Sequence, residues 1–252
     1  MSSISVSLIV FACLCGGIWL GGFLRKILPD PHLRDESKDA IRTCTGLIAT
    51  LAALVLGLLI ASTKSSLDAV NSSLVHTGVK LVALDRILSR YGAQATEVRS
   101  LLRDNLAAAI DRYWPEKGIR PTGKKPNPDE SIDAEGSMLL KLSPQDEAQR
   151  RLQSDALQIW NDLAQSRWQL IEQTHISLPM PFLVVLVFWL VILFMSFSLF
   201  VHSNVTVTTM FVLCALSAST AIFLLLEMGS PSEGFMRVSG DPLVRAYLIL
   251  GK

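Results

Sequence analysis

Four segments of this sequence are long, apolar and free of charged residues, and they limit the folds that the chain can adopt. They cover residues 4–24, 44–63, 178–201 and 205–226. About 20 apolar residues in a helix are enough to cross the hydrocarbon core of a bilayer. Inside that core only helices and closed barrels satisfy their backbone hydrogen bonds. We therefore predict an all-α membrane protein with four transmembrane helices and the lipid bilayer as its first partner.

The first apolar segment lies near the N-terminus, where a cleaved signal peptide is the alternative to a retained helix. The opening stretch MSSISVS has no positively charged side chain, and the apolar run continues to Leu24. A signal peptide has a charged start and a shorter apolar part. The pattern favours a retained transmembrane helix.

Composition narrows the classes of function. Charged residues make up 18% of the chain and its formal net charge is +1, so a basic surface that binds nucleic acid is not expected. The cysteines (Cys13, Cys15, Cys44 and Cys214) lie in or beside apolar segments, with no histidine or acid at zinc-site spacing. No serine elbow, paired-histidine motif or phosphate-binding glycine loop occurs. We expect no enzymatic activity, no metal, no cofactor and no nucleic-acid partner.

The spacing of the apolar segments divides the chain into four parts. Residues 1–63 contain a first transmembrane pair and residues 178–227 a second pair. Between them lies a hydrophilic block, residues 64–177, which is expected to be helical and outside the membrane. Residues 228–252 follow the last span, and we expect them to form a structured C-terminal cap.

The hydrophilic block contains two helical patterns and one interruption. Apolar residues recur at 3–4-residue spacing over residues 67–88 and again over residues 152–170, as in helices packed along a partner helix. The second of these helices is expected to begin with Ser143 as its cap and Pro144 at its first position. Residues 115–137 contain four prolines and few apolar side chains. Such a stretch buries little surface, so we predict a mobile loop there.

Stripes of small residues run along two of the apolar segments. In the first segment, Gly17 and Gly21 form a face that lets another helix approach closely. In the second segment, the stripe has five positions, which are Gly46, Thr50, Ala53, Gly57 and Ala61. Small and hydroxylated residues are typical of helix packing and also of a pore lining. This face is therefore a candidate for either role, and both roles are compatible in a symmetric oligomer.

The C-terminal part has a distinct order of features. Glu227 directly follows the fourth apolar segment, and a Gly-Ser-Pro break comes next. If the chain reverses at this break, Arg237 comes close enough to pair with Glu227 at the membrane edge. Asp241 and Pro242 are typical of the cap and the first position of a last helix, which we predict over residues 243–250.

The residues of this tail resemble the C-terminal pattern of a known family. The matching positions are Glu227, Pro231, Gly234, Arg237, Val238, Ser239 and Pro242. They are similar to an acid at the end of the fourth span, a following Pro-x-x-Gly turn, and an Arg-Val-Ser piece with a proline after it. Gly229 and Ser232 depart from the pattern, which has Asp or Asn and Phe there. The RYWP stretch at residues 112–115 and the two-plus-two order of spans are also similar. The resemblance is to the bestrophin-like family of bacterial multi-pass membrane proteins.

This resemblance implies a function and an assembly. Bestrophins are oligomeric anion channels with two spans on each side of a helical domain. The first hypothesis is therefore a homo-oligomeric channel for an anion or another inorganic ion in the bacterial inner membrane. Residues 44–63 have no phenylalanine for the aromatic neck of those channels. The alternative hypothesis is a non-conducting sensor or scaffold that acts through its helical block.

Basic residues in the first loop predict the orientation in the membrane. They are Arg25, Lys26, Arg34, Lys38 and Arg42. Short loops rich in Lys and Arg stay in the cytoplasm, so both termini and the helical block are expected on the extracytoplasmic side. The resemblance to bestrophins implies the reverse orientation.

Overall fold

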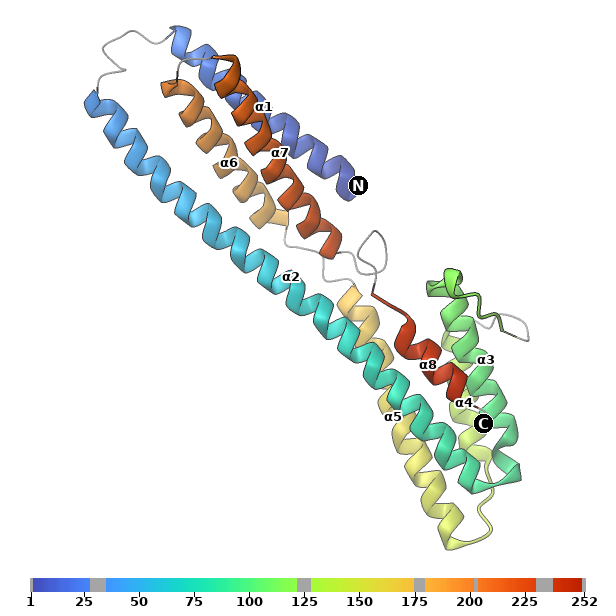
Figure 1. The fold of residues 1–252 in the computed structure, drawn as a ribbon. Coiled ribbons are helices and arrows are strands. Elements are labelled where there is room, and N and C mark those ends of the chain that lie inside the picture. Colours follow the sequence, from blue (N-terminus) through green and yellow to red (C-terminus); the bar gives the residue numbers. More distant parts are fainter. Residues whose placement is uncertain are drawn as a thin grey trace. The chain divides into compact units, whose positions relative to one another are not determined.

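The computed structural model describes residues 2–27, 35–121, 128–174, 180–201, 204–229 and 238–250, and these residues contain no β-strand. The helices are α1 (Ser3–Ile27), α2 (Asp35–Tyr91), α3 (Thr96–Tyr113), α4 (Pro128–Lys141), α5 (Glu147–Thr174), α6 (Met180–Phe200), α7 (Val205–Met228) and α8 (Asp241–Ile249) (Figure 1). Two 3-10 turns, η2 (Ala93–Ala95) and η3 (Pro115–Lys117), precede and follow α3. The predicted all-α fold is confirmed.

Four of these helices are long and apolar enough to cross a membrane, namely α1, α2, α6 and α7. They correspond to the four apolar segments of the sequence, so the predicted set of transmembrane helices is confirmed. The chain divides into two compact units. We call Met1–Leu67 with Ile176–Met236 the transmembrane unit, and Asp68–His175 with Arg237–Lys252 the helical unit. Helix α2 begins in the first unit and continues into the second.

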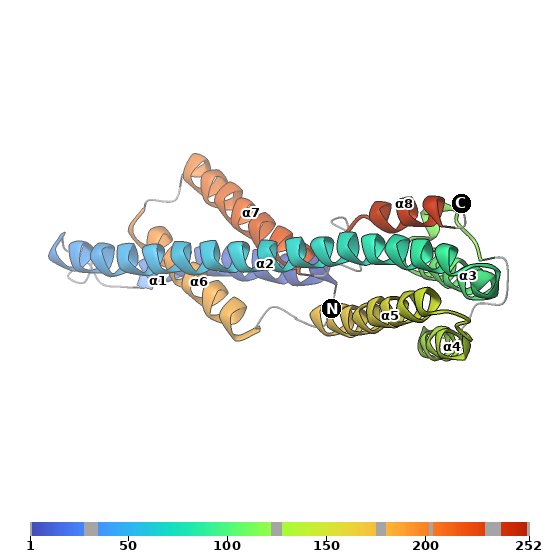
Figure 2. The ribbon, with the colours of Figure 1, turned by 90° about the horizontal axis from the view of Figure 1, so that it is seen from below.

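In the transmembrane unit, α1 packs against both α6 and α7, and α1 and α6 lie side by side in two views (Figure 1, Figure 2). Lipid tails are as apolar as leucine, so close packing and hydrogen bonds hold such helices together. The hydroxyls of Ser7 on α1 and Ser219 on α7 are 2.9 Å apart, and Ser219 also donates to the Ser7 carbonyl at 2.8 Å. Ser198 on α6 donates to the Ile18 carbonyl of α1 at 2.7 Å. These bonds tie α1 to both of its neighbours.

The helical unit has its own apolar core. Helix α3 packs against α4 and α8, and α4 packs against α5. The large, fully buried side chains of this unit come from α2, α3, α4 and the chain after α8, and they are Leu84, Leu88, Ile110, Leu139 and Leu250. Helix α2 ends at Tyr91. The next residue is Gly92, whose φ of 110° lies in a region that favours glycine. Burial of these side chains is what holds the helices of this unit together.

The prediction of a mobile loop over residues 115–137 is wrong in its last part, because helix α4 begins at Pro128. Gly136 of α4 lies so close to the Trp160 ring of α5 that a Cβ atom there would be 2.5 Å from it. Leu139, one turn further on, is fully buried. Contacts with α5 therefore stabilise a helix that the polar, proline-containing local sequence does not predict. Residues 122–127 lie outside the described residues.

The predicted start of the second long helix is also wrong. Helix α5 begins at Glu147, and the Asp146 carboxylate accepts a hydrogen bond of 2.7 Å from the Gln149 backbone N–H. Asp146 therefore caps the helix instead of Ser143. The Gln153 side chain donates to the carbonyls of Leu139 and Leu142 at 3.0 and 2.9 Å. This contact holds the chain before α5 in a non-helical path.

Candidate functional site

Helix α2 carries the predicted pore or packing face, and one side of the helix contacts the rest of the transmembrane unit. Thr45, Ala52 and Thr63 are buried on this side. The hydroxyls of Thr45 and Ser196 of α6 are 3.4 Å apart. Leu59 packs against the apolar core that α1, α6 and α7 form. This side of α2 is therefore covered by the other helices of the transmembrane unit.

The five small residues lie on another side of α2. Gly46, Thr50, Ala53, Gly57 and Ala61 are all exposed. A Cβ atom added at Gly46 or Gly57 would meet no atom within 4 Å. The Thr50 hydroxyl donates to the Leu47 carbonyl at 2.8 Å, so its oxygen presents lone pairs outward. Among the described residues, none covers this small-residue face.

Large leucines are exposed beside the small-residue face. Leu54 and Leu58 are 61% and 62% exposed, and Leu47 is similarly exposed. At 3.6 residues per turn, these leucines follow the small residues around the helix circumference. The transmembrane part of α2 thus has a covered side, a small-residue side and a leucine side. The last two are open to lipid or to another copy of the chain.

The small residues of α1 have a different environment. Gly17 and Gly21 are buried against α6. A Cβ at Gly17 would be 3.1 Å from the Val191 carbonyl oxygen, and a Cβ at Gly21 would overlap the Met195 carbonyl oxygen. Only glycine permits this approach of two helix backbones.

The RYWP stretch and the C-terminal tail meet in the helical unit. The Trp114 indole N–H donates to the Val238 carbonyl at 2.8 Å. A Cβ atom on Gly240 would be 2.7 Å from the same indole ring, so the ring lies directly on the chain that leads into α8. The sequence contains both stretches 124 residues apart, but nothing local in either one indicates that they touch.

An ion pair and two further contacts hold α8. Lys117 of η3 donates to the Asp241 carboxylate at 2.6 Å. This hydrogen bond, with a further contribution from the Ser239 side chain, lowers the pKa of Asp241 below its ordinary value. The Arg103 guanidinium lies 5.0 Å from the centre of the Tyr247 ring, within the range of cation–π attraction. A Cβ on Gly78 of α2 would lie 3.0 Å from the Pro242 carbonyl oxygen.

The N-cap of α8 is Gly240, so Asp241 is the first helical residue and not the cap.

A family model of the bestrophin-like domain matches residues 10–243. The chain belongs to the bestrophin-like family. The match includes both transmembrane pairs, the helical block and the tail up to the start of α8, and it confirms the family that the sequence predicted. Comparison with curated proteins and with solved structures finds no match.

In this bestrophin-like protein, the structure describes only part of the C-terminal motif. Val238, Ser239 and Pro242 lie at the start of the α8 segment, and Ser239 accepts a hydrogen bond of 3.2 Å from the Asp241 N–H. Glu227 is buried near the end of α7. Pro231, Gly234 and Arg237 lie outside the described residues. The pairing of Glu227 with Arg237 therefore stays a prediction.

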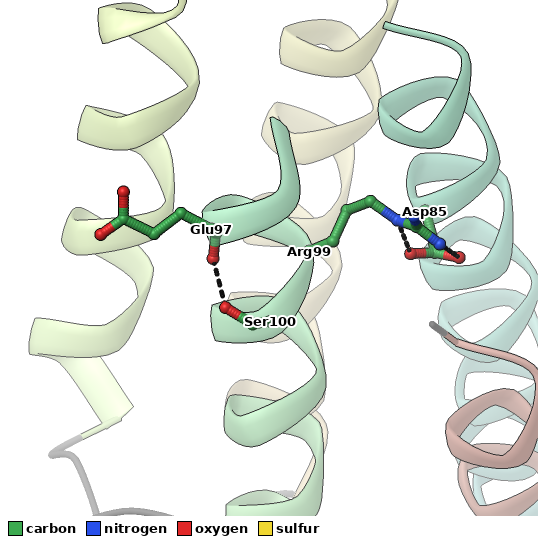
Figure 3. Close-up of polar contacts among 4 residues, drawn as sticks. All are labelled: Asp85, Glu97, Arg99 and Ser100. Carbon is green, nitrogen blue, oxygen red and sulfur yellow. Dashed lines mark hydrogen bonds and ion pairs between the residues drawn. The ribbon is translucent and has the colours of Figure 1, made fainter. Parts of the chain in front are cut away.

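Sequence reasoning did not identify the ion pair that joins α2 to α3 in this bestrophin-like protein. Arg99 reaches from α3 to Asp85 on α2, with N–O distances of 2.7 and 3.1 Å (Figure 3). The side chains are 21% and 7% exposed. The hydrogen bonds to Asp85 raise the pKa of Arg99, which keeps the guanidinium charged. The local sequence shows only that the acidic residue Asp85 follows Leu84 in an apolar repeat. It does not indicate which residue pairs with Asp85.

Proposed function

We propose that this bestrophin-like protein is a non-enzymatic, homo-oligomeric ion channel in which the small-residue face of α2 lines the pore. The observation that carries this proposal is the exposure of all five small residues of that face. Membrane helices normally bury small residues against other helices, as α1 does with Gly17 and Gly21. A face of this kind that no described residue of the chain covers is suited to line a passage between subunits.

The neighbouring leucines support the assembly part of the proposal. In a ring of parallel α2 helices, a large apolar side chain next to the small-residue face would contact the adjacent subunit. Leu54 and Leu58 are exposed at this position. Family membership favours an anion as the permeant ion, since bestrophins conduct anions. The protein would then reside in the bacterial inner membrane.

Purified protein reconstituted in liposomes is expected to conduct chloride and to elute as an oligomer in detergent. Gly57→Phe is expected to reduce the flux at least about tenfold, since a ring added at each subunit would fill a passage lined by small residues. Leu213→Phe is the control, because it adds a ring at an exposed position of α7 and leaves both the small-residue face and the leucine side of α2 unchanged. A monomeric protein without flux would exclude the channel.

The alternative is a non-conducting sensor or scaffold that acts through the helical unit. One observation favours it: residues 44–63 have no phenylalanine, so α2 does not provide an aromatic constriction in its membrane segment. In that case the small-residue face would be a packing surface between copies. An oligomer with no flux in liposomes would support this alternative over the channel.

Orientation is a separate part of the proposal. The basic residues of the first loop support a cytoplasmic position for this loop. With four spans, both termini would then lie on the extracytoplasmic side. A phosphatase reporter, which is active only outside the cytoplasm, is expected to be active when fused after Lys252. An inactive phosphatase with an active cytoplasmic reporter at the same position would establish the reverse orientation.

A further inference from the structure

A partly buried carboxyl group, that of Glu135, lies where α3, α4 and α5 meet. The Asn105 side-chain amide of α3 donates to the Glu135 carboxylate of α4 at 2.6 Å. The Trp160 indole of α5 also acts on this carboxylate and favours its ionised form. Asn105 is 6% exposed, and its carbonyl oxygen Oδ1 has no hydrogen-bond partner among the described residues. A buried acceptor in this state costs free energy.

Protonation of Glu135 would supply the missing donor. A carboxylic acid and a primary amide can form two antiparallel hydrogen bonds, because each group has one donor and one acceptor side by side. The ionised carboxylate only accepts, so it can pair with the Asn105 NH₂ group but not with Oδ1. We propose that Asn105 and Glu135 form a proton-sensitive contact that tightens the packing of α4 on α3 when Glu135 takes up a proton from solvent.

The charges around Glu135 are few. Arg167 of α5 acts on Glu135 through its charge. On the side of α3 that carries Asn105, the residues one turn before and after it are Leu101, Leu102, Ala108 and Ala109; Arg103 and Asp104 lie on other sides of the helix. On the side of α5 that carries Trp160, the corresponding residues are Ala156, Leu157, Leu163 and Ala164, and Asp162 lies on another side. On α4 the following turn offers Met138 and Leu139. Of these described positions, only Arg167 brings a charge to the contact.

Burial raises the pKa of Glu135 above its ordinary value of 4.5, because the loss of water outweighs the opposing effects of Asn105, Arg167 and Trp160. The folded state therefore binds this proton more tightly than the unfolded state. The stabilisation from protonated Glu135 is complete below pH 4.5 and is lost as the pH rises through the folded-state pKa. Acid thus favours the packing of α4.

Hydrogen exchange of the full-length protein in detergent tests the proposal. The intrinsic exchange rate divided by the observed rate of each α4 amide gives its protection factor, which is measured at about pH 4.5 and about pH 8, on either side of the expected titration. In the wild type, protection of α4 is expected to be roughly 2- to 10-fold higher at the lower pH, the effect of about one hydrogen bond.

Glu135→Gln separates the two states. A glutamine side chain pairs with Asn105 through both hydrogen bonds at every pH, so protection of α4 should be high and independent of pH. Glu97→Gln is the control on α3, since the Glu97 side chain points away from Arg99 and is exposed (Figure 3). This control should keep the wild-type pH dependence. Wild-type protection that does not change with pH, or an equal change in Glu135→Gln, would overturn the proposal.

Discussion

Arg99→Ala is expected to destabilise the helical unit by about 3 kcal/mol, the lower end of the range for breaking a buried ion pair. The substitution removes both hydrogen bonds to Asp85, at 2.7 and 3.1 Å. Asp85 is only 7% exposed, so water does not replace the guanidinium. The lower end applies because Arg99 itself keeps some contact with solvent. Thermal unfolding of the full-length protein in detergent measures the effect.

An exposed ion pair of the same unit provides the matched control. Arg150 lies 3.4 Å from Glu147, with side chains that are 70% and 65% exposed. Arg150→Ala is expected to change stability by at most about 1 kcal/mol. Equal shifts in unfolding temperature for the two variants would contradict the role given to burial.

The double variant Asp85→Leu with Arg99→Met asks a different question. It removes both charges and fills the space with apolar side chains of similar length. Such a replacement of a buried ion pair is often neutral or stabilising. We expect the double variant to unfold at a higher temperature than Arg99→Ala. A double variant less stable than Arg99→Ala would show that the loss in Arg99→Ala does not come from keeping the Asp85 charge without the guanidinium.

Gly21→Ala is expected to weaken the transmembrane unit by about 1–3 kcal/mol, the usual cost of overfilling a packed interface. A Cβ atom at this position would overlap the Met195 carbonyl oxygen and lie 3.0 Å from Cβ of Ser198. Both atoms belong to α6, so its backbone must move away from α1. The separation would also strain the hydrogen bond from Ser198 to the Ile18 carbonyl. Thermal unfolding in detergent and the yield of folded protein measure the effect.

Gly16→Ala is the control for the transmembrane unit. A Cβ atom at Gly16 would meet no atom within 4 Å, and alanine favours helix more than glycine does. This variant should therefore be as stable as the wild type or slightly more stable. If Gly16→Ala were as harmful as Gly21→Ala, the close contact with α6 would not be the cause.

Local sequence was sufficient to predict the features that depend only on neighbouring residues in the chain. Uncharged runs of about 20 residues predict membrane helices wherever they occur, and the four runs correspond to α1, α2, α6 and α7. The tail and RYWP residues were sufficient for the family, because a motif is itself a local pattern. The sequence also predicted the stripe of small residues on α2 as a candidate face, but it did not predict that this face is exposed.

Other features depended on residues far apart in the chain. Helix α4 has a polar start that predicts a loop, and it is helical because Gly136 and Leu139 pack into the helical unit. The cap of α5 is Asp146 instead of the predicted Ser143, because the Gln153 side chain donates to backbone carbonyls before the helix. In both cases a tertiary contact outweighs a local preference of about 1 kcal/mol.

The sequence by itself therefore determined that this protein is a four-span, all-α member of the bestrophin-like family. Hydrophobicity along the chain suffices for the four spans, since the bilayer acts on each segment separately, and the tail and RYWP residues suffice for the family. Only the tertiary structure decided which small residues are covered and which polar residues meet. Gly21 is covered while Gly57 is exposed, and Asp85 pairs with Arg99. The reason is that burial and pairing depend on which side of a helix a neighbour occupies, and the neighbour belongs to another part of the chain.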